Sequence, residues 1–266
     1  MELLVPRYFS VWLAFFKNSL TRDLEYKANF IGGIAVDSVY YLLYYFFFYT
    51  IFSYVDKLGS FDKEAVFIFL VISFSIDAFY MFFCANNVYK LNDYVVKGDL
   101  DFILTRPIDA QIFVSFRYVN TYAIVSILFL LPLLGILVFN SHYEPNVLQI
   151  CLFILSSAVG VSIFYAFDML LSSLVFWFRN FSLVGWLSYE VLKFSMRPDS
   201  IYTGISRKIL FSFVPMALIS SVPTRILLFE DGLHYFLYQI AIASILIGIT
   251  RLVWLRGLKK YESASS

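Results

Sequence analysis

The sequence predicts an all-α integral membrane protein with six transmembrane helices, an N-terminal amphipathic elbow helix and a re-entrant helical hairpin before the last span. Apolar residues make up 61% of the 266 residues and charged residues only 15%, whereas a soluble domain is usually about a quarter charged. Runs of about twenty apolar residues also recur, which is the length that a helix needs to cross a bilayer. The net charge of +1 and the lack of a basic arm argue against a nucleic-acid partner.

The first 27 residues predict an amphipathic helix that lies in the membrane interface. Aromatic side chains recur at helical spacing between charged residues, as in helices that lie flat on a bilayer. The apolar stripe consists of Tyr8, Trp12, Phe15, Phe16 and Leu20. This helix could be the elbow helix that precedes the first span, or it could be a simple membrane anchor with the same pattern. The sequence does not decide between these two roles.

Residues 28–258 form the predicted transmembrane domain. Four long apolar runs give the first four spans, at about 30–54, 65–87, 114–139 and 147–177. The shorter apolar segment 181–196 completes the count as the fifth span, and 233–254 is the last. The short tail at 259–266 is predicted to be disordered.

One apolar stretch does not predict a clean span. Residues 209–228 are apolar but are interrupted by Pro215 and Pro223. Broken backbone at membrane depth is tolerated where protein or a wet cavity surrounds it. We therefore expect a re-entrant hairpin at about 205–228. A true span here would place the C-terminus on the opposite side of the membrane.

Lysine and arginine residues indicate how the chain is oriented. With an inner N-terminus, thirteen of the twenty lysines and arginines fall on the inner side, in agreement with the positive-inside rule. Five of the seven outer ones lie between 193 and 225, around the broken stretch. Six spans then place both termini on the cytoplasmic side.

The polar segment 88–111 lies between two spans and predicts a short surface helix. Gly98 can end one helix in the left-handed conformation. Asp99 can cap the next, because its carboxylate can accept from free amides of the first turn. Leu100, Ile103 and Leu104 follow at helical spacing on one face. The predicted product is an apolar knob that a partner protein could grip and push.

The run Lys97-Gly-Asp-Leu-Asp-Phe-Ile-Leu-Thr-Arg-Pro107 resembles the loop "G-[ED]-L-D-x-x-L-x-[RK]-P" of short six-span type-2 ABC exporter permeases, the drug- or viologen-exporter-like permease subunits. Chain length and the late proline-bearing segment also resemble that family. The resemblance implies a coupling element that contacts an ATP-binding subunit and is formed by Gly98, Asp99, Leu100, Asp101, Leu104, Arg106 and Pro107. It also implies that an elbow helix precedes the first span and braces that contact.

The same resemblance implies the assembly. Two permease chains, identical or paralogous, would pair in the lipid of a bacterial cytoplasmic (inner) membrane, and two ATP-binding subunits would dock on the inner face. ATP and Mg would bind the partner subunits, and this chain would need no cofactor. The absence of a G-x-x-x-x-G-K-[ST] motif from the sequence agrees with an ATPase on another chain. Members of the family are often tied to the export of drugs or amphipathic compounds.

Catalytic and metal-binding motifs are absent from the sequence, including H-E-x-x-H, G-x-S-x-G and paired cysteine motifs. Acidic residues inside apolar runs are the remaining candidates, because a carboxylate in a membrane is costly and is often functional. They are Asp37, Asp77, Asp168 and Glu190. Each could line a substrate path or simply pair within the bundle. Two small-xxx-small patterns, at Ser156/Gly160 and Ser244/Gly248, predict close helix packing, within the chain or with a second permease.

Two other function classes remain open. An ion- or proton-coupled carrier could use Asp37, Asp77 and Asp168 as a relay, although such a carrier often has an inverted repeat that the sequence does not show. A membrane scaffold without transport activity would also fit the spans. Neither class accounts for the motif at 97–107.

Overall fold

The structure is a computed structural model that describes residues 4–178, 184–229 and 232–261. Nearly all of its regular structure is helical, which confirms the predicted all-α class. The first half contains α1 (Leu4–Glu25), α2 (Lys27–Ile51), strands β1 (Lys57–Leu58) and β2 (Phe61–Asp62), α3 (Lys63–Tyr80), the π-helix Met81–Ala85, α4 (Asn86–Val88), α5 (Leu91–Lys97), α6 (Leu100–Leu104) and α7 (Ala110–Phe116).

The second half begins with α8 (Ala123–Phe139) and α9 (Val147–Ser173). The remaining elements are the 3-10 turn Leu174–Phe176, α10 (Val184–Leu192), the 3-10 turns Lys193–Met196 and Asp199–Ile201, α11 (Gly204–Ser212), α12 (Ala217–Leu228) and α13 (Gly232–Lys260). The tail 259–266 is predicted to be disordered. Its first two residues, 259–260, belong to α13, and residues 262–266 lie outside the described residues. Residues 181–183 of the predicted fifth span also lie outside them.

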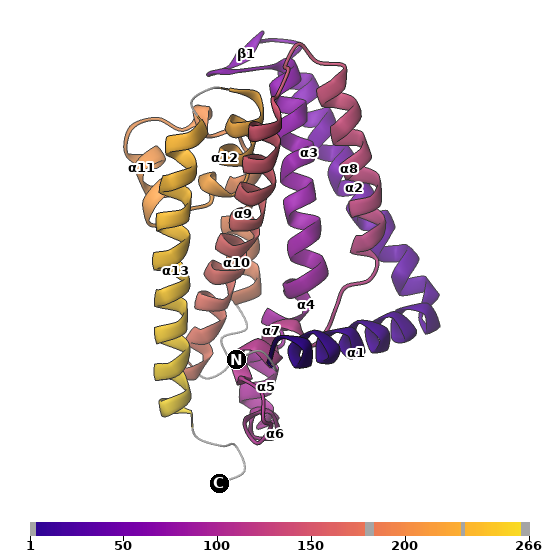
Figure 1. Ribbon diagram of the computed structural model, residues 1–266, viewed down its shortest axis with the longest axis vertical. Helices are drawn as coiled ribbons and strands as arrows, with labels where there is room; N and C mark the ends of the chain where they lie inside the picture. Colours follow the sequence, from indigo (N-terminus) through magenta and orange to yellow (C-terminus); the bar gives the residue numbers. More distant parts are fainter. Residues whose placement is uncertain (1–3, 179–183, 230–231, 262–266) are drawn as a thin grey trace.

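The molecule has two distinct ends (Figure 1). The β1–β2 hairpin marks one of them, which we call the hairpin end. Helices α1, α5, α6 and α7 gather at the other end, together with the C-terminal part of α13, and we call it the α1 end. Long helices run between the two ends, so this arrangement suits a bilayer around the middle of the bundle.

Four helical stretches in the described part of the chain are long and apolar enough to cross a membrane: Lys27–Ile51, Lys63–Lys97, Val147–Phe176 and Gly232–Lys260. The pair α11 and α12 raises the number to five if its bent path is one span. Helix α8 is apolar but has only 17 residues. The multi-pass prediction therefore agrees with the structure, while the number six stays a prediction.

Helices α1 and α2 are separated at Tyr26 and run in different directions (Figure 1). Only Phe48 of α2 is buried. Most of the apolar surface of α2 therefore faces outward, where lipid or another chain would cover it. The position of α1 in the membrane interface stays a prediction.

Helix α12 forms the centre of the bundle. Every residue from Ala217 to Leu228 is buried, and the helix packs against α3, α9 and α13. Gly160 of α9 permits this approach, because a Cβ atom there would lie 2.6 Å from the carbonyl oxygen of Ile219. The close packing predicted for Ser156/Gly160 is thus confirmed, whereas Gly248 has no atom within 4 Å of an added Cβ.

The segment 199–229, which contains Pro215 and Pro223, enters and leaves the bundle at the hairpin end. Pro215 lies at the break between α11 and α12, whose axes differ by 94°, since proline disfavours helical geometry in the residue before it. At its start, Ser200 Oγ donates to the carbonyl oxygen of Leu58 at 2.7 Å. At its end, the rings of Phe61 and Phe229 are 5.4 Å apart.

A buried ion cluster holds this segment in place. Asp199 is fully buried and accepts from Nε and Nη2 of Arg225, each at 3.1 Å. It also accepts from Nη2 of Arg207 at 3.1 Å, and Arg225 Nη2 donates to Ser60 Oγ at 3.3 Å. The buried carboxylate is thereby compensated by two guanidinium groups, as a charge out of water must be.

The predicted third span at 114–139 is wrong at its start. Helix α7 ends at Phe116 and α8 begins only at Ala123. The intervening backbone is held by other hydrogen bonds: Asn87 Oδ1 accepts from the amide of Tyr118 at 2.6 Å, and Asn87 Nδ2 donates to the carbonyl oxygen of Tyr118 at 2.8 Å. These contacts replace helical bonds that the apolar pattern alone would favour.

Candidate functional site

Two features of the structure could serve a function. One is the predicted coupling loop 88–111 at the α1 end, and the other is a groove between α2, α3 and α8.

Gly98 ends α5 with φ of 79°, in the left-handed region that glycine adopts without a Cβ clash. Its predicted role as a helix terminator is therefore confirmed.

The predicted cap by Asp99 is wrong. Asp99 occupies the position before α6, but its side chain makes no capping hydrogen bond. Its φ and ψ of −65° and −16° are helical, whereas a capping residue usually has extended backbone that turns its side chain toward the free amides. The Asp99 side chain is instead exposed at the protein surface.

The apolar face of α6 also differs from the prediction. Leu100 and Ile103 are 0% and 2% exposed, while Phe102 and Leu104 are 71% and 43% exposed. Leu100 is therefore an internal anchor and not part of an exposed knob. The apolar side chains that a partner could reach are those of Phe102 and Leu104.

The two anchors of α6 belong to a compact cluster at the α1 end. The cluster joins the loop to the ends of α9 and α13 and consists of Val88, Leu91, Tyr94, Leu100, Ile103, Phe113, Val114, Met169, Val175, Phe176 and Trp254. Gly257 lets α13 approach, because an added Cβ would lie 2.2 Å from the Phe176 ring. The short surface helix packs against α5 and α7, and the shared cluster connects it to the two long helices α9 and α13.

A salt bridge adds a second connection between the loop and α13. Asp109 Oδ1 caps α7 by accepting from the amide of Ile112 at 3.1 Å, and Asp109 Oδ2 accepts from Nη2 of Arg251 at 2.7 Å. Partial burial alone would raise the pKa of the Asp109 carboxyl. The hydrogen bonds from Arg251 and Ile112 outweigh burial, so the pKa lies below its usual value.

The residue after α13 also lies beside the loop. Tyr261 contacts the ring of Phe176, with centroids 6.2 Å apart. Burial, followed by the nearby carboxylate of Asp101, raises the pKa of Tyr261 to about 12. Arg106 and Pro107 are exposed where the chain turns from α6 toward α7. The predicted loop residues thus lie together, but only some of them face outward.

The four predicted intramembrane acids do not form one site. Asp168 is fully buried and accepts from the Tyr80 hydroxyl. Asp37 accepts from Ser126 Oγ at 3.2 Å, and Asp77 is partly buried on α3. Glu190 pairs with Lys193 at 2.6 Å within one turn. Among the described residues no three His, Cys, Asp or Glu side chains could hold a metal ion.

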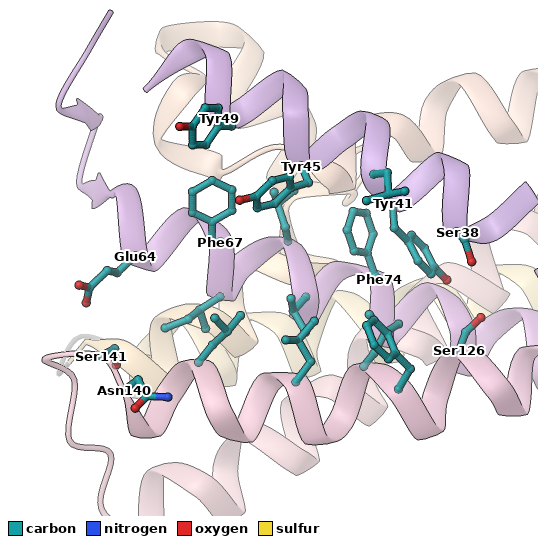
Figure 2. A pocket seen from close by; sticks show the side chains of 18 of the residues that line it. Ser38, Tyr41, Tyr45, Tyr49, Glu64, Phe67, Phe74, Ser126, Asn140 and Ser141 are labelled. Atoms are coloured by element: carbon teal, nitrogen blue, oxygen red, sulfur yellow. The ribbon is translucent and has the colours of Figure 1, made fainter. Parts of the chain in front are cut away.

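The groove between α2, α3 and α8 has a volume of about 810 Å³ (Figure 2). Tyr41, Tyr45 and Tyr49 project into it from successive turns of α2, opposite Phe67 and Phe74 of α3. Residues 40–49 form an aromatic run in the sequence, but the sequence does not show which aromatic side chains of α3 and α8 lie opposite it.

Apart from the tyrosine hydroxyls, the polar side chains labelled in Figure 2 lie at the two ends of this groove. Glu64, Asn140 and Ser141 lie at the hairpin end, and Ser38 and Ser126 lie at the other. A surface of this kind can hold an apolar or amphipathic molecule but offers no set of groups for catalysis.

The comparisons with known proteins give one informative match. No curated protein and no solved structure matches this sequence. The family profile described as "ABC-2 family transporter protein" matches residues 38–265, which include the groove-forming helices, the loop and the buried α12. Because that match spans most of the chain, the protein belongs to the ABC-2 transporter family and is a multi-pass membrane permease of an ABC transporter.

Proposed function

We propose that this chain is the membrane-spanning subunit of an ATP-driven exporter. It pairs with a second permease chain, identical or paralogous, to form the translocation path. Two separate ATP-binding subunits dock at its α1 end and supply ATP hydrolysis. Family membership supports an ABC partner, and the lack of a P-loop in the sequence is consistent with ATP binding on another chain.

The observation that carries the proposal is that α6 has exposed apolar side chains on one side and buried ones on the other. Phe102 and Leu104 are exposed for a partner, while Leu100 and Ile103 are buried in the cluster that also contains Met169 of α9 and Trp254 of α13. Protein interiors are close-packed and transmit displacement. A push on the exposed side chains would therefore move the ends of two long helices.

The proposed orientation places the α1 end in the cytoplasm of a bacterial inner membrane. Most of the lysines and arginines assigned to the inner side lie near this end, as the positive-inside rule requires. We place apolar or amphipathic cargo in the groove between α2, α3 and α8, since most residues of α2 are exposed to the surroundings.

The experiment replaces Phe102 and Leu104 by Asp in the purified transporter with its ATP-binding subunits. We expect binding of those subunits to weaken by about 30-fold or more, the loss typical of a central apolar contact, and permease-stimulated ATPase activity to fall with it. Ile205→Asp is the matched control, because Ile205 is 77% exposed on α11 at the opposite end.

Normal binding and ATPase stimulation in the Phe102/Leu104 variant would refute the proposed contact. Transport that persists without ATP-binding subunits and follows a proton gradient would instead favour a carrier. Thermal unfolding of each variant serves as the folding control, because both changes are at exposed positions and should leave the midpoint nearly unaltered.

A further inference from the structure

A group of cations surrounds two aromatic rings at the α1 end. The guanidinium carbons of Arg106 and Arg117 lie 4.9 and 5.4 Å from the centroid of the Phe113 ring. Lys90 Nζ lies 3.6 Å and the Arg117 guanidinium carbon 5.1 Å from the centroid of the Tyr118 ring. Arg117 thus shares the Phe113 ring with Arg106 and the Tyr118 ring with Lys90. We call Lys90, Arg106 and Arg117 the basic cluster.

Three carboxylates at the α1 end pair with other cations. Asp23 pairs with Arg22 at 2.8 Å, Asp93 with Lys97 at 3.6 Å, and Asp109 with Arg251 at 2.7 Å. Asp99 and Asp101 lie toward Tyr261. Within residues 4–178, 184–229 and 232–261, no ion pair joins a carboxylate to any member of the basic cluster. Its positive charge is therefore available to an external anion.

An apolar groove begins at the same aromatic ring. It has a volume of about 470 Å³ and lies between α1 and α7, with Phe9, Trp12, Phe15, Ile112, Phe113 and Phe116 among its lining residues. Phe113 thus forms part of the groove wall and also carries two of the three cations. An apolar slot next to a cationic group matches a molecule with an anionic head and a hydrocarbon tail.

We propose that the basic cluster and the groove between α1 and α7 together bind one anionic phospholipid. The phosphate lies against Lys90, Arg106 and Arg117, and an acyl chain fills the groove. Basic pockets at the cytoplasmic surface are known to attract anionic headgroups. An acidic protein segment would match the charge but not the adjoining aromatic slot. The site requires only that the α1 end lies at a membrane surface, so it does not depend on the proposed transport function.

The test uses the full chain purified in a neutral detergent without ATP-binding subunits. The thermal unfolding midpoint is measured with added dioleoyl phosphatidylglycerol, dihexanoyl phosphatidylglycerol or dioleoyl phosphatidylcholine. A specific ligand of the folded state raises the midpoint. We expect the largest rise with dioleoyl phosphatidylglycerol, because only this lipid has both the anionic head and a tail long enough for the groove.

The double variant Arg106→Gln/Arg117→Gln should lose most of that rise. Each neutralised arginine should weaken lipid binding by about fivefold. Arg106→Lys/Arg117→Lys keeps the charge and should retain the rise. The control Arg256→Gln/Lys259→Gln removes two charges at the same end, outside the basic cluster, and should also retain it.

Three results would overturn the proposal. The lipid-dependent rise of the unfolding midpoint could be unchanged in the Arg106/Arg117 glutamine variant, or the Arg256/Lys259 control could lose as much of that rise as the glutamine variant. In the original protein, the two phosphatidylglycerols could raise the midpoint equally. If the glutamine variant responds normally to lipid but no longer retains the ATP-binding subunits, the cluster recognises protein. A failure of the proposed transport function would leave the lipid-dependent midpoints unchanged, so the two ideas fail separately.

Discussion

Asp109 shows how one side chain can hold a surface loop on a long helix. It caps α7 and pairs with Arg251 of α13, whose Nη1 also donates to Gln111 Oε1 at 2.7 Å. Side-chain exposures of 42% for Arg251 and 31% for Asp109 leave the pair open to water, which weakens it. The Asp109–Arg251 pair therefore adds little to the free energy of folding, and it also fixes the position of the loop.

We predict that Asp109→Asn destabilises the protein by about 0.5–1 kcal/mol at pH 7, the range for a partly exposed pair. Asn caps a helix as well as Asp does, so the change removes the charge but keeps the cap. The folded-state pKa of Asp109 is lowered from 3.8, so its stabilisation is present above that value and disappears as the pH falls through the lower folded-state pKa. Thermal unfolding midpoints should therefore converge at low pH; a constant difference would contradict this account.

At the scale of elements, the contact between α9 and α12 determines how closely the bundle can pack. Gly160 touches the backbone of Ile219, and Gln239 of α13 connects both helices. Its Nε2 donates to the carbonyl oxygen of Leu218 at 2.9 Å, and its Oε1 accepts from Ser156 Oγ at 2.6 Å. Small side chains and interhelical hydrogen bonds are the usual means of helix association in a membrane.

We predict that Gly160→Ala destabilises the protein by about 1–3 kcal/mol, because the added methyl group would overpack a rigid contact. Gly248→Ala is the matched control: it alters the corresponding position of the other small-residue pattern, where the added Cβ meets no atom within 4 Å. Unfolding midpoints in detergent measure both. Equal midpoints for the two variants would show that α12 can move away from α9 at little cost.

The elements also show what the sequence alone could and could not predict. Long apolar runs and Pro215 act through local chemistry, so they predicted the long helices and the broken segment before α13. The break at 117–122 depends on Asn87, about thirty residues earlier, and no local pattern reveals that contact. Likewise, helical spacing placed Leu100 and Leu104 on one face, but the tertiary packing of the cluster at the α1 end decides which of them is buried.

At the scale of the whole molecule, the path of the chain constrains the number of crossings. Phe176 belongs to the cluster at the α1 end, while Asp199 is bound to Arg225, which reaches Ser60 at the hairpin end. The chain must therefore pass from one end to the other between these residues. Segment 199–229 then starts and finishes at the hairpin end, and α13 returns to the α1 end (Figure 1). The predicted six crossings and re-entrant α11–α12 pair agree with this path, and both stay predictions.

We predict that cysteine labelling in intact cells follows this path. The two native cysteines, Cys84 and Cys151, are first replaced by Ser. Ser206→Cys, exposed on α11, should then react with a membrane-impermeant thiol reagent from outside. Thr105→Cys, exposed after α6, should react only after the membrane is permeabilised.

Lys259→Cys decides between the two paths, because it lies near the end of α13. Protection of this cysteine in intact cells means that α11 and α12 turn back within the membrane, and that the end of α13 shares one side with the loop. If it reacts from outside while Thr105→Cys stays protected, the bent pair is a span. The basic end of α13 would then lie away from the cytoplasm, against the charge distribution that orients membrane proteins. In that case the contact between α13 and the loop at the α1 end could not exist in the membrane.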